Sequence, residues 1–271
     1  MLGEPLISVD SIEPVWFGLV DHVEDLAFEE DGTVWCGGEE GQIYRGRLEG
    51  EPEIVARTPG RTYGFALGPD GACHCADVAE PGVYRIDSEG EVARVSGGTD
   101  DRPAVLPNDL AFLPNGVLLF SDSGNWGESD GCIYSVNGGT RVVDTTCAAY
   151  PNGLAISPDG TELAVVESTL PGISVLSLDQ DGSLSDRRVL VEMPGTVPDG
   201  LLYDEEGRLL ISCWAPDAIF RLEENGALSV VVHDPLRVVL NQPTNIAFVP
   251  GTNRLVAANI GDRYLSVFEY A

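Results

Sequence analysis

The chain has 271 residues and carries 44 acidic side chains against 15 basic ones, for a net charge of −29. So acidic a surface argues against nucleic acids and anionic membranes as partners. No apolar run approaches the roughly 20 residues that a membrane-spanning helix needs. The opening MLGEPLISVD has no basic segment followed by an apolar stretch, so we read no secretion signal and expect a cytoplasmic protein.

Two explanations of the acidity stay open. All basic residues are arginine, which fits an acidic protein from a GC-rich genome. The excess of carboxylates also fits a halophile, whose proteins stay hydrated in a salty cytoplasm. In the second case added monovalent salt should screen the self-repulsion and raise both stability and activity.

Near-repeats of one phrase run the length of the chain, and the second residues of successive phrases lie 39, 45, 44, 47 and 45 residues apart. The phrases are VEDLAF (Val23–Phe28), TYGFAL (Thr62–Leu67), PNDLAF (Pro107–Phe112), PNGLAI (Pro151–Ile156), PDGLLY (Pro198–Tyr203) and PTNIAF (Pro243–Phe248). A period of about 40–50 residues with strand-like units is typical of a β-propeller with one blade per repeat. We therefore predict an all-β, six-bladed propeller that forms a single domain over residues 1–271.

Most repeats predict the same four antiparallel strands. The phrase opens strand one and ends at a tight turn such as Pro114–Gly116, strand two follows as in Val117–Ser121, and strand three as in Cys132–Val136. The sixth repeat stops after three strands, and we expect Pro5–Ile12 to supply its fourth and close the ring. The six cysteines form no C-x-x-C pair, so we expect buried thiols and no zinc site.

The second position of the phrases carries the candidate chemistry. In a propeller the first strand of each blade lines the central channel, so Glu24, Asn108, Asn152 and Asp199 should converge at its mouth. Carboxylate and amide oxygens suit a hard divalent cation, with Ca²⁺ first and Mg²⁺ or Mn²⁺ next. Any one of these residues could instead be an ordinary turn residue. Four of them at the same repeat position favour a metal site with free positions for water and substrate.

The motifs PNDLAF, PNGLAISPDG, PDGLLYDEEGRLLISCW and PTNIAF resemble the family of regucalcin (senescence marker protein), gluconolactonase and luciferin-regenerating enzyme, over essentially the whole chain. The resemblance implies a six-bladed propeller that hydrolyses lactones, often of sugar acids. It implies metal ligation by Glu24, Asn152 and Asp199. It also places Asn108 beside the metal, in contact with substrate or water, and leaves Zn²⁺ or Fe as further candidates for the ion.

Two departures from this family matter. Sugar lactonases often carry Arg where this chain has Leu106, which puts a polyhydroxylated substrate in doubt. The Glu-Asp and Asn-Asp pairs are similar to those of paraoxonase-type propellers, and that resemblance implies a second, structural Ca²⁺ held by Asp25, Asp109 and the backbone carbonyl of Phe65. The paraoxonase histidine of blade two is Tyr63 here, so a histidine-based mechanism does not carry over.

Further residues are assigned with alternatives. Asp122 is either a second carboxylate at the mouth or a turn residue. Tyr63, Trp126 and Trp214 are candidate walls of a substrate pocket, as is Trp16, although packing is an ordinary role for any tryptophan. The match GESDG lies in a loop with no helix after it, which argues against a nucleophile elbow.

The sequence therefore predicts a metal-dependent hydrolase of a lactone or related ester. Asp199, or alternatively Asp122, would take a proton from the attacking water, and Asn108 would contact substrate. The alternatives are a strictosidine-synthase-like enzyme that condenses or cyclises its substrate, and a non-catalytic propeller that binds calcium or another ligand. We expect a small-molecule substrate and a monomer or small homo-oligomer.

Overall fold

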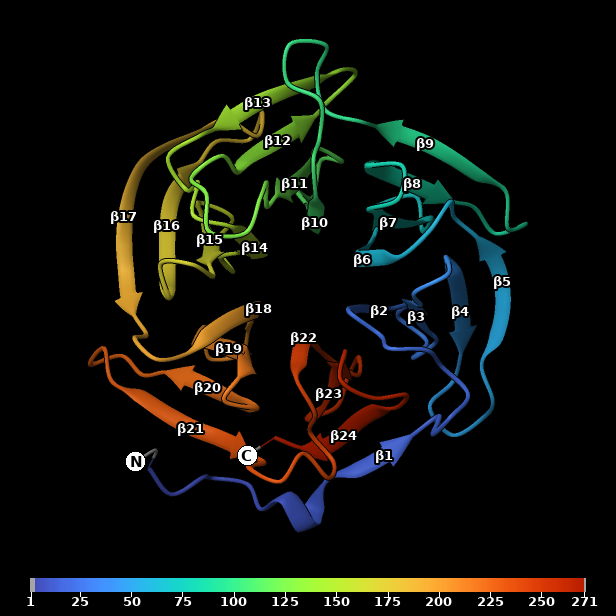
Figure 1. Cartoon of the computed structure of the whole chain (residues 1–271), viewed down its shortest axis with the longest axis vertical. Coiled ribbons are helices and arrows are strands. Elements are labelled where there is room, and N and C mark those ends of the chain that lie inside the picture. The colour runs from blue at the N-terminus through green and yellow to red at the C-terminus, as the bar shows by residue number, and fades with distance from the viewer. Residues whose placement is uncertain (1–2, 271) are drawn as a thin grey trace.

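The computed structural model describes residues 3–270 and folds into six four-stranded antiparallel sheets arranged around a ring (Figure 1). The predicted six-bladed propeller is confirmed. The sheets, each listed from its innermost strand outwards, are β2 (Leu26–Phe28), β3 (Val34–Gly37), β4 (Gln42–Gly46) and β5 (Glu53–Arg57); β6 (Thr62–Leu67), β7 (Cys73–Asp77), β8 (Gly82–Ile86) and β9 (Val92–Ser96); β10 (Pro107–Phe112), β11 (Leu118–Asp122), β12 (Cys132–Val136) and β13 (Thr140–Asp144); β14 (Pro151–Ile156), β15 (Glu162–Glu167), β16 (Gly172–Leu178) and β17 (Leu184–Glu192); β18 (Val197–Tyr203), β19 (Leu209–Ala215), β20 (Ala218–Leu222) and β21 (Leu228–His233); and β22 (Pro243–Phe248), β23 (Arg254–Asn259), β24 (Leu265–Glu269) and β1 (Glu13–Val15).

The ring closes through the N-terminal part of the chain, but not through the segment that the sequence indicated. β1 pairs with β24 over Glu13–Val15 and completes the sixth blade. The prediction that Pro5–Ile12 forms this strand is wrong. That segment instead crosses from the fifth blade to the sixth, where Ile7 and Ile12 pack into the apolar cluster between the two blades. A short 3-10 turn, η1 (Val9–Ser11), lies within it.

The hydrophobic core is divided among the spaces between neighbouring blades. One cluster joins β15 and β16 of the fourth blade to β19 and β20 of the fifth, for example through Val175 and Ile211. The predicted tight turns are present, and Gly116 adopts the left-handed φ of 90° that a tight turn favours. All six cysteines are buried and free, as expected. Among the described residues, the structure has no helix long and apolar enough to cross a membrane.

The innermost strands share an irregularity at the repeated phrase. In β10, Pro107 pairs with Asp122 and Leu110 with Phe120, so two residues on β10 face only one on β11. The same shift occurs in β6, β14, β18 and β22. A bulge of this kind re-aims side chains and is common next to active sites. It takes the second and third residues of the phrase out of the regular alternation of a strand.

Candidate active site

One cavity collects the repeat-opening residues. It has a volume of about 300 Å³. Its lining consists of Glu24, Tyr63, Asn108, Trp126, Tyr150, Asn152, Ser168, Val197, Asp199, Trp214 and Ile260. The structure thus brings the four predicted ligands together with three of the four candidate pocket walls, Tyr63, Trp126 and Trp214, from five of the six blades.

The four predicted ligands are deeply buried and incompletely paired. Glu24, Asn108, Asn152 and Asp199 are each no more than 6% exposed. Glu24 Oε2, Asn108 Oδ1, Asn152 Oδ1 and Asp199 Oδ1 are buried without a hydrogen-bond partner. Only eight buried side-chain nitrogen or oxygen atoms between residues 3 and 270 share this condition, so half of them belong to this set. Buried polar atoms are normally paired, and four unpaired oxygens around one cavity fit the ligand set of a hard cation.

The two asparagines are oriented by serines. Asn108 Nδ2 donates to Ser123 Oγ at 2.9 Å, and that hydroxyl donates to the carbonyl of Pro151 at 2.8 Å. Asn152 Nδ2 donates to Ser168 Oγ at 3.4 Å in the same way, and Ser168 donates to the carbonyl of the following phrase. Because each amide nitrogen is held on the serine, each amide oxygen is left for the cavity. Such outer contacts fix the direction of metal ligands in known sites.

The electrostatics of the cavity also favour a cation site. Burial raises the pKa of Glu24 to about 7, against a partial opposing effect of Arg61. Burial, and then repulsion from Glu24 and Asp109, raises the pKa of Asp199 well above its usual range. Two carboxylates in so dry a place resist being charged together unless a cation joins them. The protein alone does not supply that cation inside the cavity, since no arginine lines it among the described residues.

The neighbouring residues Asp25 and Asp109 are held differently. Asp25 Oδ1 and Oδ2 accept the main-chain N–H groups of Leu26 and Phe65. Asp109 Oδ1 and Oδ2 accept those of Leu110 at 2.7 Å and Leu154 at 2.6 Å. Each aspartate therefore joins its own blade to the next one.

Two sequence-based candidates lie outside the cavity. Asp122 Oδ2 accepts the N–H of Val105, and its Oδ1 accepts those of Leu106 and Gly124. This geometry favours the turn role over the second carboxylate at the mouth. Trp16 is not a pocket wall, because it is buried in the apolar cluster between the sixth and first blades and donates its indole N–H to Gly50.

The sequence missed four lining residues: Tyr150, Ser168, Val197 and Ile260. Tyr150 and Val197 each stand immediately before a repeated phrase, so position alone could have identified them. Ser168, like Ser123, directly follows an acidic residue at the end of strand two, and this recurrence was a readable signal. Ile260 lies in the loop after β23, where the sequence gives no comparable indication.

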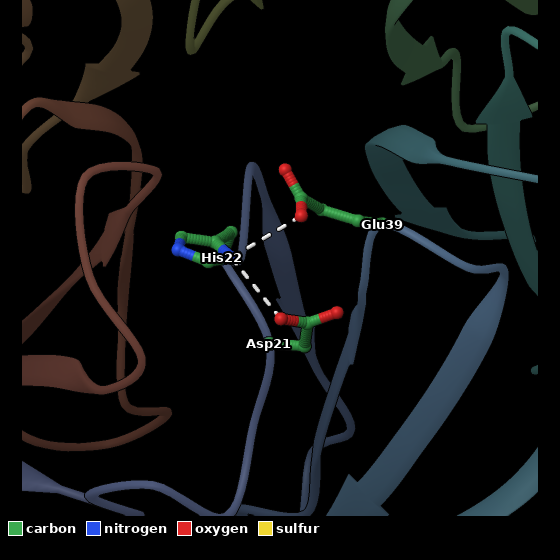
Figure 2. A group of neighbouring side chains, drawn as sticks. All are labelled: Asp21, His22 and Glu39. Atoms are coloured by element: carbon green, nitrogen blue, oxygen red, sulfur yellow. Dashed lines mark hydrogen bonds and ion pairs between the residues drawn. The ribbon is translucent and has the colours of Figure 1, made fainter.

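A second group of titratable side chains lies on the first blade, outside the lining of the cavity. Figure 2 shows His22 between Asp21 and Glu39, with Nδ1 at 3.1 Å from Asp21 Oδ1 and 3.4 Å from Glu39 Oε2. Arg61 lies 3.3 Å from Glu39, and Arg263 lies 3.7 Å from Asp21. These charges compensate one another, and the group is a partly exposed ion-pair network.

Another cavity, of about 360 Å³, lies against β16 and β17 on the fourth blade. Its one deeply buried acid, Glu167, accepts hydrogen bonds from Ser174 and Arg187. The charge of this acid is therefore met by an arginine within the protein, in contrast to the acids of the central cavity.

The fold and the cavity together define a class: a six-bladed propeller whose inner strands direct buried oxygen atoms of four blades into one cavity. Residues 25–258 match the model of the SMP-30/gluconolactonase/LRE-like region, and the chain belongs to this family. The predicted family is thereby confirmed.

Individual relatives agree with this assignment. The chain is 32% identical to gluconolactonase of Zymomonas mobilis over 203 residues, which cover 67% of this chain and 56% of the relative. It is 27% identical to strictosidine synthase-like protein 6 of Arabidopsis thaliana over 235 residues, covering 77% and 61%. The chain thus spans less than two thirds of the length of these relatives. Its fold is similar to that of the calcium-binding protein regucalcin from Agrobacterium tumefaciens, with a TM-score of 0.75, 21% identity and coverage of 95% and 93%.

Proposed function

We propose that the protein is a metal-dependent hydrolase of a lactone or related ester, with its cation at the mouth of the central channel. The observation that carries the proposal is the set of four buried, unpaired oxygens from Glu24, Asn108, Asn152 and Asp199. The gluconolactonase relative supports the reaction class. Ca²⁺ is the first candidate because all four ligands are hard oxygens and the regucalcin neighbour binds calcium. Mg²⁺, Mn²⁺, Zn²⁺ or Fe remain outcomes of the test.

The four residues would hold the cation, which when bound supplies Lewis acidity toward a carbonyl oxygen. Asp199 has a second carboxylate oxygen besides the one assigned to the cation, and this second oxygen would take a proton from the attacking water. The amide oxygen of Asn108 is fixed by Ser123 and can orient that water or the substrate. Tyr63, Trp126, Tyr150 and Trp214 line the same cavity, so a bound substrate would displace water from these polar groups.

A second structural Ca²⁺ between Asp25 and Asp109 is a separate proposal. Its support is that both carboxylates are buried, and that burial and then repulsion from Asp109 raise the pKa of Asp25 well above its usual range. Their main-chain N–H partners offer an account of the same burial without an ion. Chelation distinguishes the two: a bound ion would make the melting temperature of an Asp199→Asn variant fall with EDTA, whereas main-chain pairing alone would leave it unchanged.

Two alternative functions can be tested with the same protein preparation. The strictosidine synthase-like relative favours a condensing or cyclising enzyme, and the regucalcin neighbour favours a calcium-binding protein without turnover. Under all three proposals the partner is a small molecule or ion, and the chain acts as a cytoplasmic monomer or small homo-oligomer.

The test uses protein stripped with EDTA and reloaded with each divalent metal in turn. Hydrolysis of δ-valerolactone and glucono-δ-lactone is followed by proton release. We expect turnover that needs the metal, falls sharply in Asp199→Asn and persists in Asp122→Asn. Metal binding without hydrolysis of any lactone would contradict the proposal and favour the two alternatives.

A further inference from the structure

The walls of the central cavity are aromatic and aliphatic, in contrast to its four unpaired oxygens. They are formed by Tyr63, Trp126, Tyr150, Val197, Trp214 and Ile260. Four of these six side chains are aromatic and two are aliphatic. Within the described part of the chain, no arginine, histidine or carboxylate outside the proposed ligand set lines the cavity.

Few polar atoms in this wall are free for a substrate. The hydroxyl of Ser168 already accepts from Asn152 and donates to the carbonyl of Pro198. What remains are two phenol hydroxyls and two indole N–H groups, all uncharged; burial raises the pKa of Tyr63 to about 12, so its phenol stays neutral near pH 7. A phenol hydroxyl can donate and accept, but two phenols and two indole N–H groups are too few to pair every hydroxyl of a polyhydroxylated ring. Against Val197 and Ile260 its hydroxyls would lose water without gaining partners.

The nearest cation does not change this chemistry. The guanidinium of Arg61 lies over the ring of Tyr63, 5.5 Å from its centroid, and is paired with Glu39. Arg61 does not line the cavity. A substrate that carried a carboxylate would therefore meet the acidic ligand set without an arginine beside it.

The rim shows where an apolar substituent would lie. Trp126 is 62% exposed and packs edge-on against Tyr150, with ring centroids 4.8 Å apart. Trp214 is also exposed, at 37%. Large apolar side chains left open at the edge of a cavity are covered favourably by an apolar ligand. A volume of about 300 Å³ lies at the small end of ligand pockets.

From these observations we propose that the substrate is a small, uncharged lactone bearing an alkyl or aromatic group, and not a polyhydroxylated one. This inference rests on the proposed lactone hydrolysis and specifies its substrate class. The ring carbonyl would lie beside the cation that the unpaired oxygens would hold, and the substituent would lie against Trp126 and Trp214.

The kinetic test compares δ-decalactone, δ-valerolactone and glucono-δ-lactone, which share the six-membered ring, on the Ca²⁺-loaded protein. Each kcat/KM is divided by the spontaneous hydrolysis rate of that lactone. We expect δ-decalactone to exceed glucono-δ-lactone by about 10-fold or more, the scale at which an apolar pocket discriminates. An equal or higher value for glucono-δ-lactone would overturn the inference and leave lactone hydrolysis standing. Hydrolysis of none of the three would overturn both.

A binding measurement gives a readout that does not depend on turnover. Metal-free protein is titrated with δ-decalactone while the tryptophan fluorescence is followed. We expect a saturable change with δ-decalactone and none with glucono-δ-lactone. Trp126→Ala and Trp214→Ala should each weaken this binding several-fold, whereas Leu236→Ala, an 80% exposed leucine outside the cavity, should not. Equal binding of both lactones, or loss of binding in Leu236→Ala, would count against the assigned wall.

Discussion

Adjacent residues of the repeated phrase are used in opposite ways. At the second position, Glu24 and Asn108 leave an oxygen atom unpaired in the cavity. At the third position, Asp25 and Asp109 have both oxygens occupied by main-chain N–H groups of their own and the next blade. Burial is the same for both positions, at 2–5% exposure. Buried acids and amides in this ring therefore fall into two classes. Those at the second position lack a partner for one oxygen, whereas those at the third position already have main-chain partners for both.

Other repeated phrases carry a glycine at the third position, where the inner strands of neighbouring blades come close together. The strand after Asp109 carries Gly153 at its own third position, and a Cβ there would lie 2.4 Å from the carbonyl oxygen of Asp199. Only a residue without a side chain lets the two inner strands approach so closely. Gly153 thus lets β14 approach β18, while the N–H of Leu154, the next residue, is donated to Asp109 of β10. Over the first four phrases the third position therefore alternates between an aspartate that joins blades (Asp25, Asp109) and a glycine that admits the neighbouring strand (Gly64, Gly153).

Removing the charge of an acid at the second position is expected to have the largest effect. Glu24→Gln and Asp199→Asn should each lower kcat/KM by more than ~100-fold, because loss of an outer contact alone costs a metal site 10–100-fold. The metal-free protein should become more stable at pH 8, since an unpaired buried charge is removed. Steady-state kinetics and urea unfolding measure the two effects. A variant that kept its activity, or lost stability in the absence of metal, would contradict the assignment.

Neutralising the third position should do the reverse. Asp109→Asn leaves one amide oxygen for two main-chain N–H groups, those of Leu110 and Leu154, so one buried N–H loses its acceptor and the free energy of unfolding should fall by about 1–3 kcal/mol. Asp31→Asn is the matched control, an exposed aspartate that also accepts a main-chain N–H, and should cost less than about 1 kcal/mol. Urea unfolding decides the outcome. If Asp109→Asn were as stable as the control, Asp109 would not join the blades.

The serines that orient the asparagines offer a smaller, more specific change. Ser123→Ala and Ser168→Ala free the amides to rotate and should weaken Ca²⁺ binding by about 10-fold. Calorimetric titration measures the affinity directly. Ser135→Ala is the control, because Ser135 is equally buried but its hydroxyl has no partner and lies away from the cavity. Equal affinities in all three variants would mean that the serines serve the blade contacts only.

The pH dependence should sharpen the contrast between metal-free and metal-loaded protein. The pKa of Glu24 rises from 4.5 to about 7 on folding, and that of Asp109 from 3.8 to about 7. The folded state then binds more protons than the unfolded state between about pH 4 and 7, so metal-free stability should fall as the pH rises through this window. Ca²⁺ favours the charged forms, so its stabilising effect should be larger at pH 8 than at pH 5. Melting temperatures with EDTA and with Ca²⁺ at both values test this, and an equal gap would contradict it.

Much of the fold and of the site was predictable from the sequence, because a repeated phrase implies a symmetric arrangement of the blades. Once six phrases indicated six blades, the second residue of each phrase had to approach one axis, which placed Glu24, Asn152 and Asp199 together without any side-chain detail. The bulge that directs Asn152 and Asp199 was not predictable, because it depends on the pairing register between neighbouring strands. The closing strand was misplaced to Pro5–Ile12, since an apolar, β-prone segment packs equally well across two blades. The large surface charge was read from composition alone, and its meaning stays a prediction that a salt series on the melting temperature would test.

The central claim is that the four unpaired oxygens form one cation site. A crystal structure of the protein grown with Ca²⁺ tests it most directly, with the ion identified by its anomalous scattering. The account predicts one Ca²⁺ at about 2.3–2.6 Å from oxygens of Glu24, Asn108, Asn152 and Asp199. A cavity without an ion at saturating calcium, or an ion bound only beside Asp21 and Glu39, would contradict it.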